Sequence, residues 1–313
     1  MNRRTLLVST SIAAALTLAG CGAGATAGTG SASDGASGAS DGGGGLAVVA
    51  STDVWGDVAA SVGGEHVQVT SLITDPEADP HEYEASTRNQ LAVSKAAVVI
   101  ANGGGYDDFI DRMLDAAGDS SATVLNAVEI SGRTATGGEE LNEHVWYDLP
   151  TVQKVIDRLI SAFSEALPEQ AEDFARNGAA LKTSVGELLD REDELKGAGS
   201  GRGVAITEPV PLYMLEAIGL ENRTPAEFSE AVEEGEDVSV TVLQEVLALL
   251  EDRQVDLLAY NEQAAGPQTE QVQQAAEDAG IPVVPFTETL PKGQDYVTWM
   301  GANLDALAQA LGA

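Results

Sequence analysis

In each half of this chain, short apolar runs alternate with segments of helical periodicity. This alternation constrains the fold more than any other feature. The apolar runs of the first half are Leu46–Ser51, Val67–Ile73, Ala97–Ala101 and Thr123–Asn126. Those of the second half are Val204–Thr207, Val255–Tyr260 and Pro282–Thr287. Strand-length runs that alternate with helices are typical of α/β units with parallel sheets.

A helical stretch joins the two halves. Apolar residues recur at i, i+3, i+4 and i+7 from Val152 to Leu167, and Pro150 suits the first turn of a helix there. Pro168 then kinks the helix or begins a second one, which continues to about Lys196. The folded part has about 270 residues, a length that favours two lobes over one core. We predict an α/β fold with two lobes, each with a mainly parallel sheet flanked by helices, joined by a long connecting helix and separated by a crevice.

The first 21 residues are typical of a signal peptide. Two arginines precede an apolar run, Leu6–Leu18, which is too short for a convincing membrane span. The sequence LAGC at positions 18–21 resembles the bacterial lipobox, whose cysteine becomes lipidated. We therefore expect acyl chains on Cys21 to hold the protein at the outer face of the bacterial cytoplasmic membrane.

The residues after Cys21 are almost all Gly, Ala, Ser, Thr and Asp, a composition that predicts a flexible tether. These patterns divide the chain into five segments. They are a signal peptide with its lipobox Cys (1–21), a Gly/Ser-rich tether (22–45), an N-terminal α/β lobe (46–148), a connecting helical segment (149–197) and a C-terminal α/β lobe (198–313).

The charge of the chain limits its partners. Sixteen Lys and Arg against 50 Asp and Glu give a formal net charge of −34, so no basic face is available for nucleic acid. The electrostatic field of so acidic a chain attracts small cations.

The counts of two residue types exclude further kinds of site. A single cysteine excludes an intrachain disulfide and a thiolate metal cluster. Aromatic residues, at 4%, are too few for a base- or sugar-stacking surface.

Only three histidines are present, so each one is informative. His66 begins a predicted strand after a turn, and we expect it to be an exposed edge residue. His81 lies in an acidic, Pro-containing loop between a strand and a helix, and His144 ends the polar, acidic loop 131–143 just before the long helix. Loops between regular elements commonly carry binding groups, which makes His81 and His144 candidate ligands.

Polar side chains also follow three predicted strands of the second half. Glu208, Asn261 and Glu288 each come directly after a strand, at the edge where open α/β sheets bind ligands. Two imidazoles from one lobe and two carboxylates from the other can meet across the crevice. Two neutral imidazoles and two carboxylates together carry −2, which balances a divalent cation.

The types of ligand narrow the choice of ion. Mg²⁺ and Ca²⁺ prefer oxygen ligands alone, and Cu(I) prefers sulfur. Zn²⁺ and Mn²⁺ fit best, with Fe²⁺ behind them. Four protein ligands leave no open position for an activated water, so we expect a bound metal and no enzyme activity.

Two motifs resemble the metal-binding lipoproteins of zinc and manganese ABC importers, the cluster A-I solute-binding family. DPHEYE at 79–84 is similar to the D-P-H-x-[FY]-E loop of that family, and HVWYD at 144–148 is similar to its H-x-W-x-D motif. The resemblance implies that His81 and His144 are metal ligands, joined by Glu208 and Glu288. It also implies two lobes joined by one long helix, and delivery of the ion to the transmembrane subunits of an ABC permease.

The chain departs from the family pattern at two positions. Glu208 in place of His gives a ligand set of two His and two carboxylates, which in this family favours manganese. Glu288 stands where Asp is usual, so Asn261 or Glu262 is an alternative fourth ligand. We expect Asn261 and Gln263 to orient the ligands from outside the coordination shell. The protein is expected to be a monomer that does not bind nucleic acid. The alternatives are an extracytoplasmic metallohydrolase, or a lipoprotein that binds an organic solute or acts as an adhesin.

Overall fold

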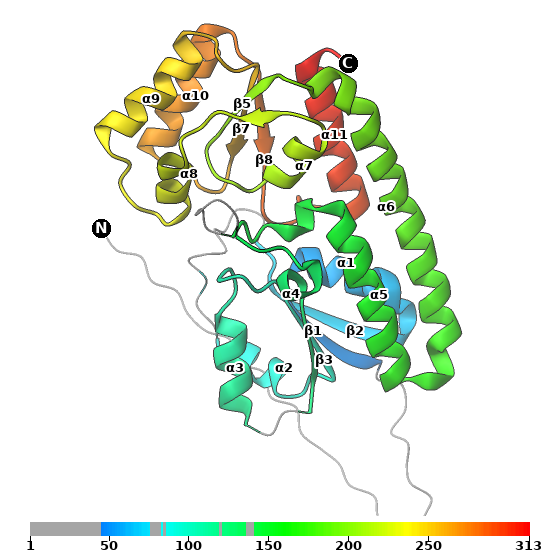
Figure 1. Ribbon diagram of the computed structural model, residues 1–313. Helices are drawn as coiled ribbons and strands as arrows, with labels where there is room; N and C mark the ends of the chain where they lie inside the picture. Colours follow the sequence, from blue (N-terminus) through cyan, green and yellow to red (C-terminus); the bar gives the residue numbers. More distant parts are fainter. Residues whose placement is uncertain (1–44, 76–82, 84–85, 119–120, 136–140) are drawn as a thin grey trace, which may run out of the picture. The chain divides into compact units, whose positions relative to one another are not determined.

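Two parallel four-stranded sheets form the framework of the protein (Figure 1). The computed structural model describes residues 45–75, 83, 86–118, 121–135 and 141–313. The first sheet has the order β2-β1-β3-β4 and consists of β1 (Leu46–Thr52), β2 (Val67–Ile73), β3 (Val98–Ala101) and β4 (Thr123–Asn126). The second has the order β6-β5-β7-β8 and consists of β5 (Gly203–Ile206), β6 (Glu221–Asn222), β7 (Leu257–Asn261) and β8 (Val283–Phe286).

Helices connect these strands and join the two sheets. In the first lobe they are α1 (Asp53–Gly63), η1 (Gly64–His66), α2 (Thr87–Val93), α3 (Phe109–Ala117) and α4 (Ala127–Ser131). Between the sheets they are η3 (Val145–Tyr147), α5 (Leu149–Ala166), η4 (Pro168–Gln170) and α6 (Ala171–Gly199). In the second lobe they are α7 (Leu212–Ala217), α8 (Ala226–Glu233), α9 (Val240–Glu251), α10 (Pro267–Ala279) and α11 (Tyr296–Leu311).

Both sheets have the same strand order, which places a topological switch point in each. In the second sheet, β5 pairs with β6 on one side and with β7 on the other, all in parallel. Helical connections therefore leave β5 toward one side and β7 toward the other, and side chains at the carboxyl ends of these strands line an open crevice. Glu208 and Asn261 lie at these two strand ends.

The predicted fold class is confirmed. The helical repeat from Val152 corresponds to α5, and Pro168 ends it, since η4 separates α5 from α6. The elements that the periodicity missed are short: α4 has 5 residues, β6 has 2 and α8 has 8. So few residues show no full apolar repeat, and packing against the rest of the lobe stabilises them.

Helix α6 connects the lobes. Its 29 residues span about 44 Å at 1.5 Å per residue. It packs against α1 and α5 of the first lobe and against α7 and α11 of the second (Figure 1). One helix therefore supports both sheets.

The largest cluster of buried apolar side chains runs through both lobes, and each lobe also has a smaller cluster of its own. The buried aromatic side chains of Trp146 and Tyr147 continue the contact from Tyr106 in the first lobe to Phe286 and Trp299 in the second. Aromatic pairs of this kind add about 0.5–1.5 kcal/mol each beyond the burial of their area. The two lobes are joined by packed side chains as well as by the connecting helix.

Hydrogen bonds reinforce this junction. The backbone N–H groups of Leu290 and Tyr296 donate to the carboxylates of Asp53 and Asp57 on α1, at 3.2 and 2.9 Å. The hydroxyl of Tyr147 donates to the carbonyl of Thr287 at 2.8 Å. These bonds link residues far apart in the sequence. The first two hold the segment between β8 and α11 against α1, and the third joins η3 to the loop after β8.

His66 directly precedes the edge strand β2, as predicted, but it is less exposed than expected. Its side chain is half-buried at the end of η1, where it lies edge-on to Phe174 and 2.8 Å from the Oδ2 atom of Asp173. Both partners belong to α6, so a helix more than one hundred residues further along covers a position that local sequence alone presents as exposed.

The N-terminal predictions concern residues outside the described ranges. Cys21 and residues 1–44 are among them. None of the helices in the described part of the chain is long and apolar enough to cross a membrane.

Candidate metal centre

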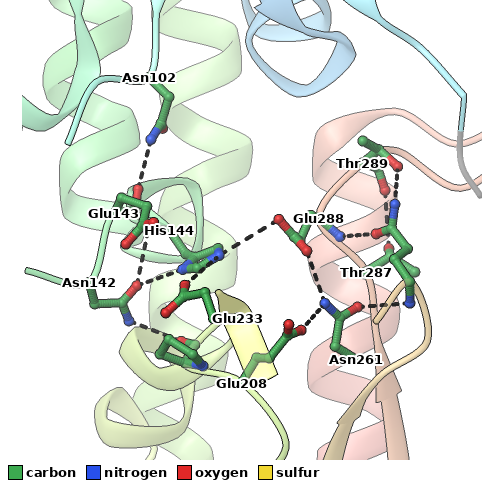
Figure 2. A network of polar contacts seen from close by, with 12 residues as sticks. Asn102, Asn142, Glu143, His144, Glu208, Glu233, Asn261, Thr287, Glu288 and Thr289 are labelled. Atoms are coloured by element: carbon green, nitrogen blue, oxygen red, sulfur yellow. Dashed lines mark hydrogen bonds and ion pairs between the residues drawn. The ribbon is translucent and has the colours of Figure 1, made fainter. Parts of the chain in front are cut away.

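His144 lies at the centre of the polar network in Figure 2. Its side chain is fully buried at the start of η3. The Oδ1 atom of Asn142 accepts the backbone N–H of His144 at 3.0 Å, and the Nδ1–H of the same imidazole donates to it at 2.8 Å. Nδ1 therefore carries the ring proton, and Nε2 is the nitrogen that can bind a metal.

The loop around His144 is held from both lobes. Asn102, just after β3, donates from Nδ2 to the carbonyl of Glu143 at 2.9 Å. Asn142 donates from its own amide to the carbonyl of Pro209 at 2.9 Å, and the hydroxyl of Tyr213 donates to the carbonyl of Asn142 at 2.7 Å. The imidazole is thereby fixed relative to the segment that follows Glu208 (Figure 2).

Two carboxylates of the second lobe meet at one amide. Asn261, the last residue of β7, donates from Nδ2 to Glu208 and, at 2.9 Å, to Oε1 of Glu288. Both carboxylates are almost completely buried. The parallel register places the ends of β5, β7 and β8 side by side, since Ile206 pairs with Ala259 and Asn261 with Phe286.

A second amide orients the loop of Glu288. Gln263 accepts the backbone N–H of Glu288 through Oε1 and donates from Nε2 to the hydroxyl of Thr289 at 3.0 Å. Its backbone N–H donates to Oδ1 of Asn261 at 3.0 Å. Asn261 thus contacts both carboxylates, and Gln263 contacts the backbone of Glu288 and the amide of Asn261. The orienting role of the two side chains stays a prediction.

The imidazole and Glu288 face each other across the lobes. Nε2 of His144 lies 3.7 Å from Oε2 of Glu288. Two ligand atoms bound at about 2.1 Å to one ion lie about 3 to 3.5 Å apart, so the two atoms are close to the separation that a single metal requires.

The sequence reasoning missed two further carboxylates. Oε1 of Glu233, at the end of α8, also lies 3.7 Å from Nε2 of His144. Ligand atoms of Glu143, His144 and Glu233 all lie within 4.8 Å of one another. Glu143 precedes a candidate histidine, which is a weak sequence signal, and Glu233 follows no strand and belongs to no motif.

Burial and charge shift the protonation of this site. Burial favours the neutral imidazole, but the facing carboxylates, Glu288 first among them, raise the pKa of His144 to about 9. Burial raises the pKa of Glu233 to about 8, although His144 opposes this shift. In the metal-free site, His144 and Glu233 therefore hold protons at neutral pH. A divalent cation that binds there can take the place of these protons.

The structure brings three of the four predicted ligands into one network. His144, Glu208 and Glu288 lie together, whereas His81 lies outside the described residues. The side chain of Glu262 is exposed, and Asn261 is occupied with the two carboxylates. Glu288 is therefore the better candidate for the fourth ligand. An imidazole nitrogen with several carboxylates suits Zn²⁺, Mn²⁺ or Fe²⁺.

The fold and these residues define a two-lobe solute-binding protein with a polar centre between the lobes. Residues 48–310 match the model of the ZnuA family, described as "Zinc-uptake complex component A periplasmic". The chain belongs to this family. The predicted resemblance is thereby confirmed, and the roles of His81, His144, Glu208 and Glu288 as metal ligands stay a prediction.

Two curated relatives are similar in sequence. The manganese-binding lipoprotein MntA of Bacillus subtilis strain 168 is 32% identical over 149 residues, which are 47% of this chain and 48% of that relative. The protein of the same name from Halalkalibacterium halodurans is 28% identical over 232 residues, which are 70% of this chain and 73% of that relative. The match thus spans about half the length of the first relative.

A solved structure shows the same fold. The periplasmic zinc binding protein TroA from Treponema pallidum aligns with a TM-score of 0.73 and 19% identity, over 86% of this chain and 99% of that chain.

Proposed function

We propose that this protein is an extracytoplasmic solute-binding lipoprotein that captures Mn²⁺ or Zn²⁺ and delivers it to an ABC permease. The observation that carries the proposal is the position of His144. Its Nε2 atom is turned toward buried carboxylates of the other lobe, 3.7 Å from Glu288. His144, Glu208 and Glu288 would hold the ion, with His81 as the ligand that the sequence motif supplies.

The charge of the ligand set favours capture over catalysis. Several carboxylates and an imidazole match a divalent ion, and a full protein shell leaves no position for an attacking water. Family members are components of uptake systems, which supports a permease as the partner. The names of the two relatives support manganese as the cargo, and they support lipidation at Cys21.

The test is metal binding by the His144→Ala variant. We expect its affinity for Mn²⁺ and Zn²⁺ to fall by about a hundredfold or more, because the only described imidazole of the site is lost. Titration calorimetry of the metal-free protein gives this affinity directly.

His66→Ala is the matched control. His66 contacts α6 and no residue of the metal centre, so its loss should leave affinity within about twofold of the parent. Equal affinity in the His144→Ala variant and in the parent would contradict the proposed site. A parent protein that binds neither ion would contradict the function itself.

A further inference from the structure

Glu233 faces the same imidazole nitrogen as the predicted ligand Glu288. Its Oε1 atom and the Oε2 atom of Glu288 each lie 3.7 Å from Nε2 of His144. The side chain of Glu233 is only 15% exposed. By distance, Glu233 is placed as well as Glu288 to share an ion with His144 (Figure 2).

Glu233 and Glu143 also line a large acidic cavity. It has a volume of about 1090 Å³, and it lies between the loop before His144 and the segments of β5, α7 and α8. The carboxylates that line it are Glu143, Glu216, Glu221, Glu230, Glu233 and Glu234. Since one water occupies about 30 Å³, a hydrated cation fits with ease. No Lys, Arg or His is among the described residues that line this cavity.

We propose that Glu233 is a metal ligand carried by α8, which meets the incoming ion at the inner end of the cavity and adds a carboxylate to the shell of His144, Glu208 and Glu288. This inference rests on the proposed function. A carboxylate buried beside other carboxylates is costly unless a cation neutralises it. A divalent ion at this place satisfies the imidazole nitrogen and the surrounding oxygens together.

The additional ligand bears on metal selectivity. Zn²⁺ is satisfied by four ligands in a tetrahedral shell, whereas Mn²⁺ suits six-coordinate, oxygen-rich sites. A further carboxylate raises the coordination number and the share of oxygen. Glu233 should therefore contribute more to Mn²⁺ binding than to Zn²⁺ binding.

The experiment compares Glu233→Gln with Glu234→Gln in the full chain. Both variants replace a carboxyl group of the cavity lining by an amide, and only the first alters the group beside His144. We expect Glu233→Gln to weaken Mn²⁺ binding by about tenfold or more and Zn²⁺ binding less, and Glu234→Gln to stay within about twofold for both ions. Calorimetry with each metal alone gives the affinities, and thermal unfolding of the metal-free variants verifies the fold.

Each outcome has a defined meaning. If the parent binds neither ion, the proposed function fails. If the parent binds and the two variants behave alike, Glu233 acts only through general charge, and the inference is wrong. If Glu233→Gln binds more tightly than the parent, Glu233 is a latch that competes with the ion for His144, which overturns the inference as well.

Discussion

Asn142 shows how a single side chain fixes the chemistry of the site. Its carbonyl oxygen accepts from the backbone and the ring Nδ1 of His144, and its amide nitrogen donates to Pro209 of the second lobe. The same residue therefore sets the tautomer of the imidazole and ties it to the loop that carries Glu208. Substitution of a residue that orients a metal ligand in this way commonly lowers metal affinity by about 10–100-fold.

We expect Asn142→Ala to lower metal affinity by about tenfold or more, because the imidazole loses its fixed tautomer and orientation. Asn142→Asp keeps an acceptor for Nδ1 and should restore part of the loss. Asn177→Ala is the control, since Asn177 donates to Val62 in the first lobe and contacts no site residue. Calorimetry of the three variants is the measurement, and an Asn142→Ala variant with parental affinity would exclude this orienting role.

Helix α6 carries a buried carboxyl group in its C-terminal half. Glu192 is 3% exposed, and its Oε1 atom has no hydrogen-bond partner among the described residues. Burial raises the pKa of Glu192 to about 8, with a further contribution from Asp148 and an opposing one from Lys196. The native helix therefore favours the protonated form at neutral pH.

The stability of the protein should consequently depend on pH. The folded pKa of Glu192 lies above its ordinary value of 4.5, so the native state binds more protons than the unfolded state between these values. The free energy of unfolding then falls as the pH rises from about 4.5 to about 8, by at most about 5 kcal/mol from this group. Denaturant unfolding at several pH values measures the slope.

Glu192→Gln should lower the slope by the part that Glu192 contributes, because the amide is neutral at every pH, whereas the raised pKa of Glu233 still contributes its own part. Glu187→Gln, at an exposed position of the same helix, is the control and should keep the parental slope. A parental slope in the Glu192→Gln variant would show that other groups cause the dependence.

At the scale of the whole molecule, the two lobes are held together by more than the connecting helix. One apolar cluster includes buried residues of both sheets, and the N–H groups of Leu290 and Tyr296 bond to Asp53 and Asp57 on α1. Packed interiors resist continuous deformation, so wide hinge bending would have to break this junction. We infer that loops and short elements such as α8 move more than whole lobes do.

Small-angle scattering tests this expectation. The radius of gyration of the metal-free and metal-loaded protein should agree closely, since the junction stays intact in both states. The double variant Asp53→Ala, Asp57→Ala loosens the junction and should show a larger difference between the two states. A large closure of the parent on metal binding would be inconsistent with this account.

Much of the fold could be predicted from the sequence, because strands and long helices show in local sequence patterns. Short apolar runs identified the strands, and a period of 3.6 residues identified the long helices. A strand that ends before Glu208 or Glu288 places either residue at the carboxyl edge of a sheet. The two-lobe fold with a long connecting helix followed from these signals. The helix α8 was not recognised, and the sequence did not show that α6 partly covers His66.

The sequence by itself determined which residues stand at strand ends and which short motifs carry histidines, because these properties depend on neighbours along the chain. Only the tertiary structure decided that Asn261 joins Glu208 to Glu288, and that Glu233 lies as close to His144 as Glu288 does. The physical reason is that these contacts depend on how whole elements pack. Residues 144 and 233 belong to different lobes, and no local period records the distance between them.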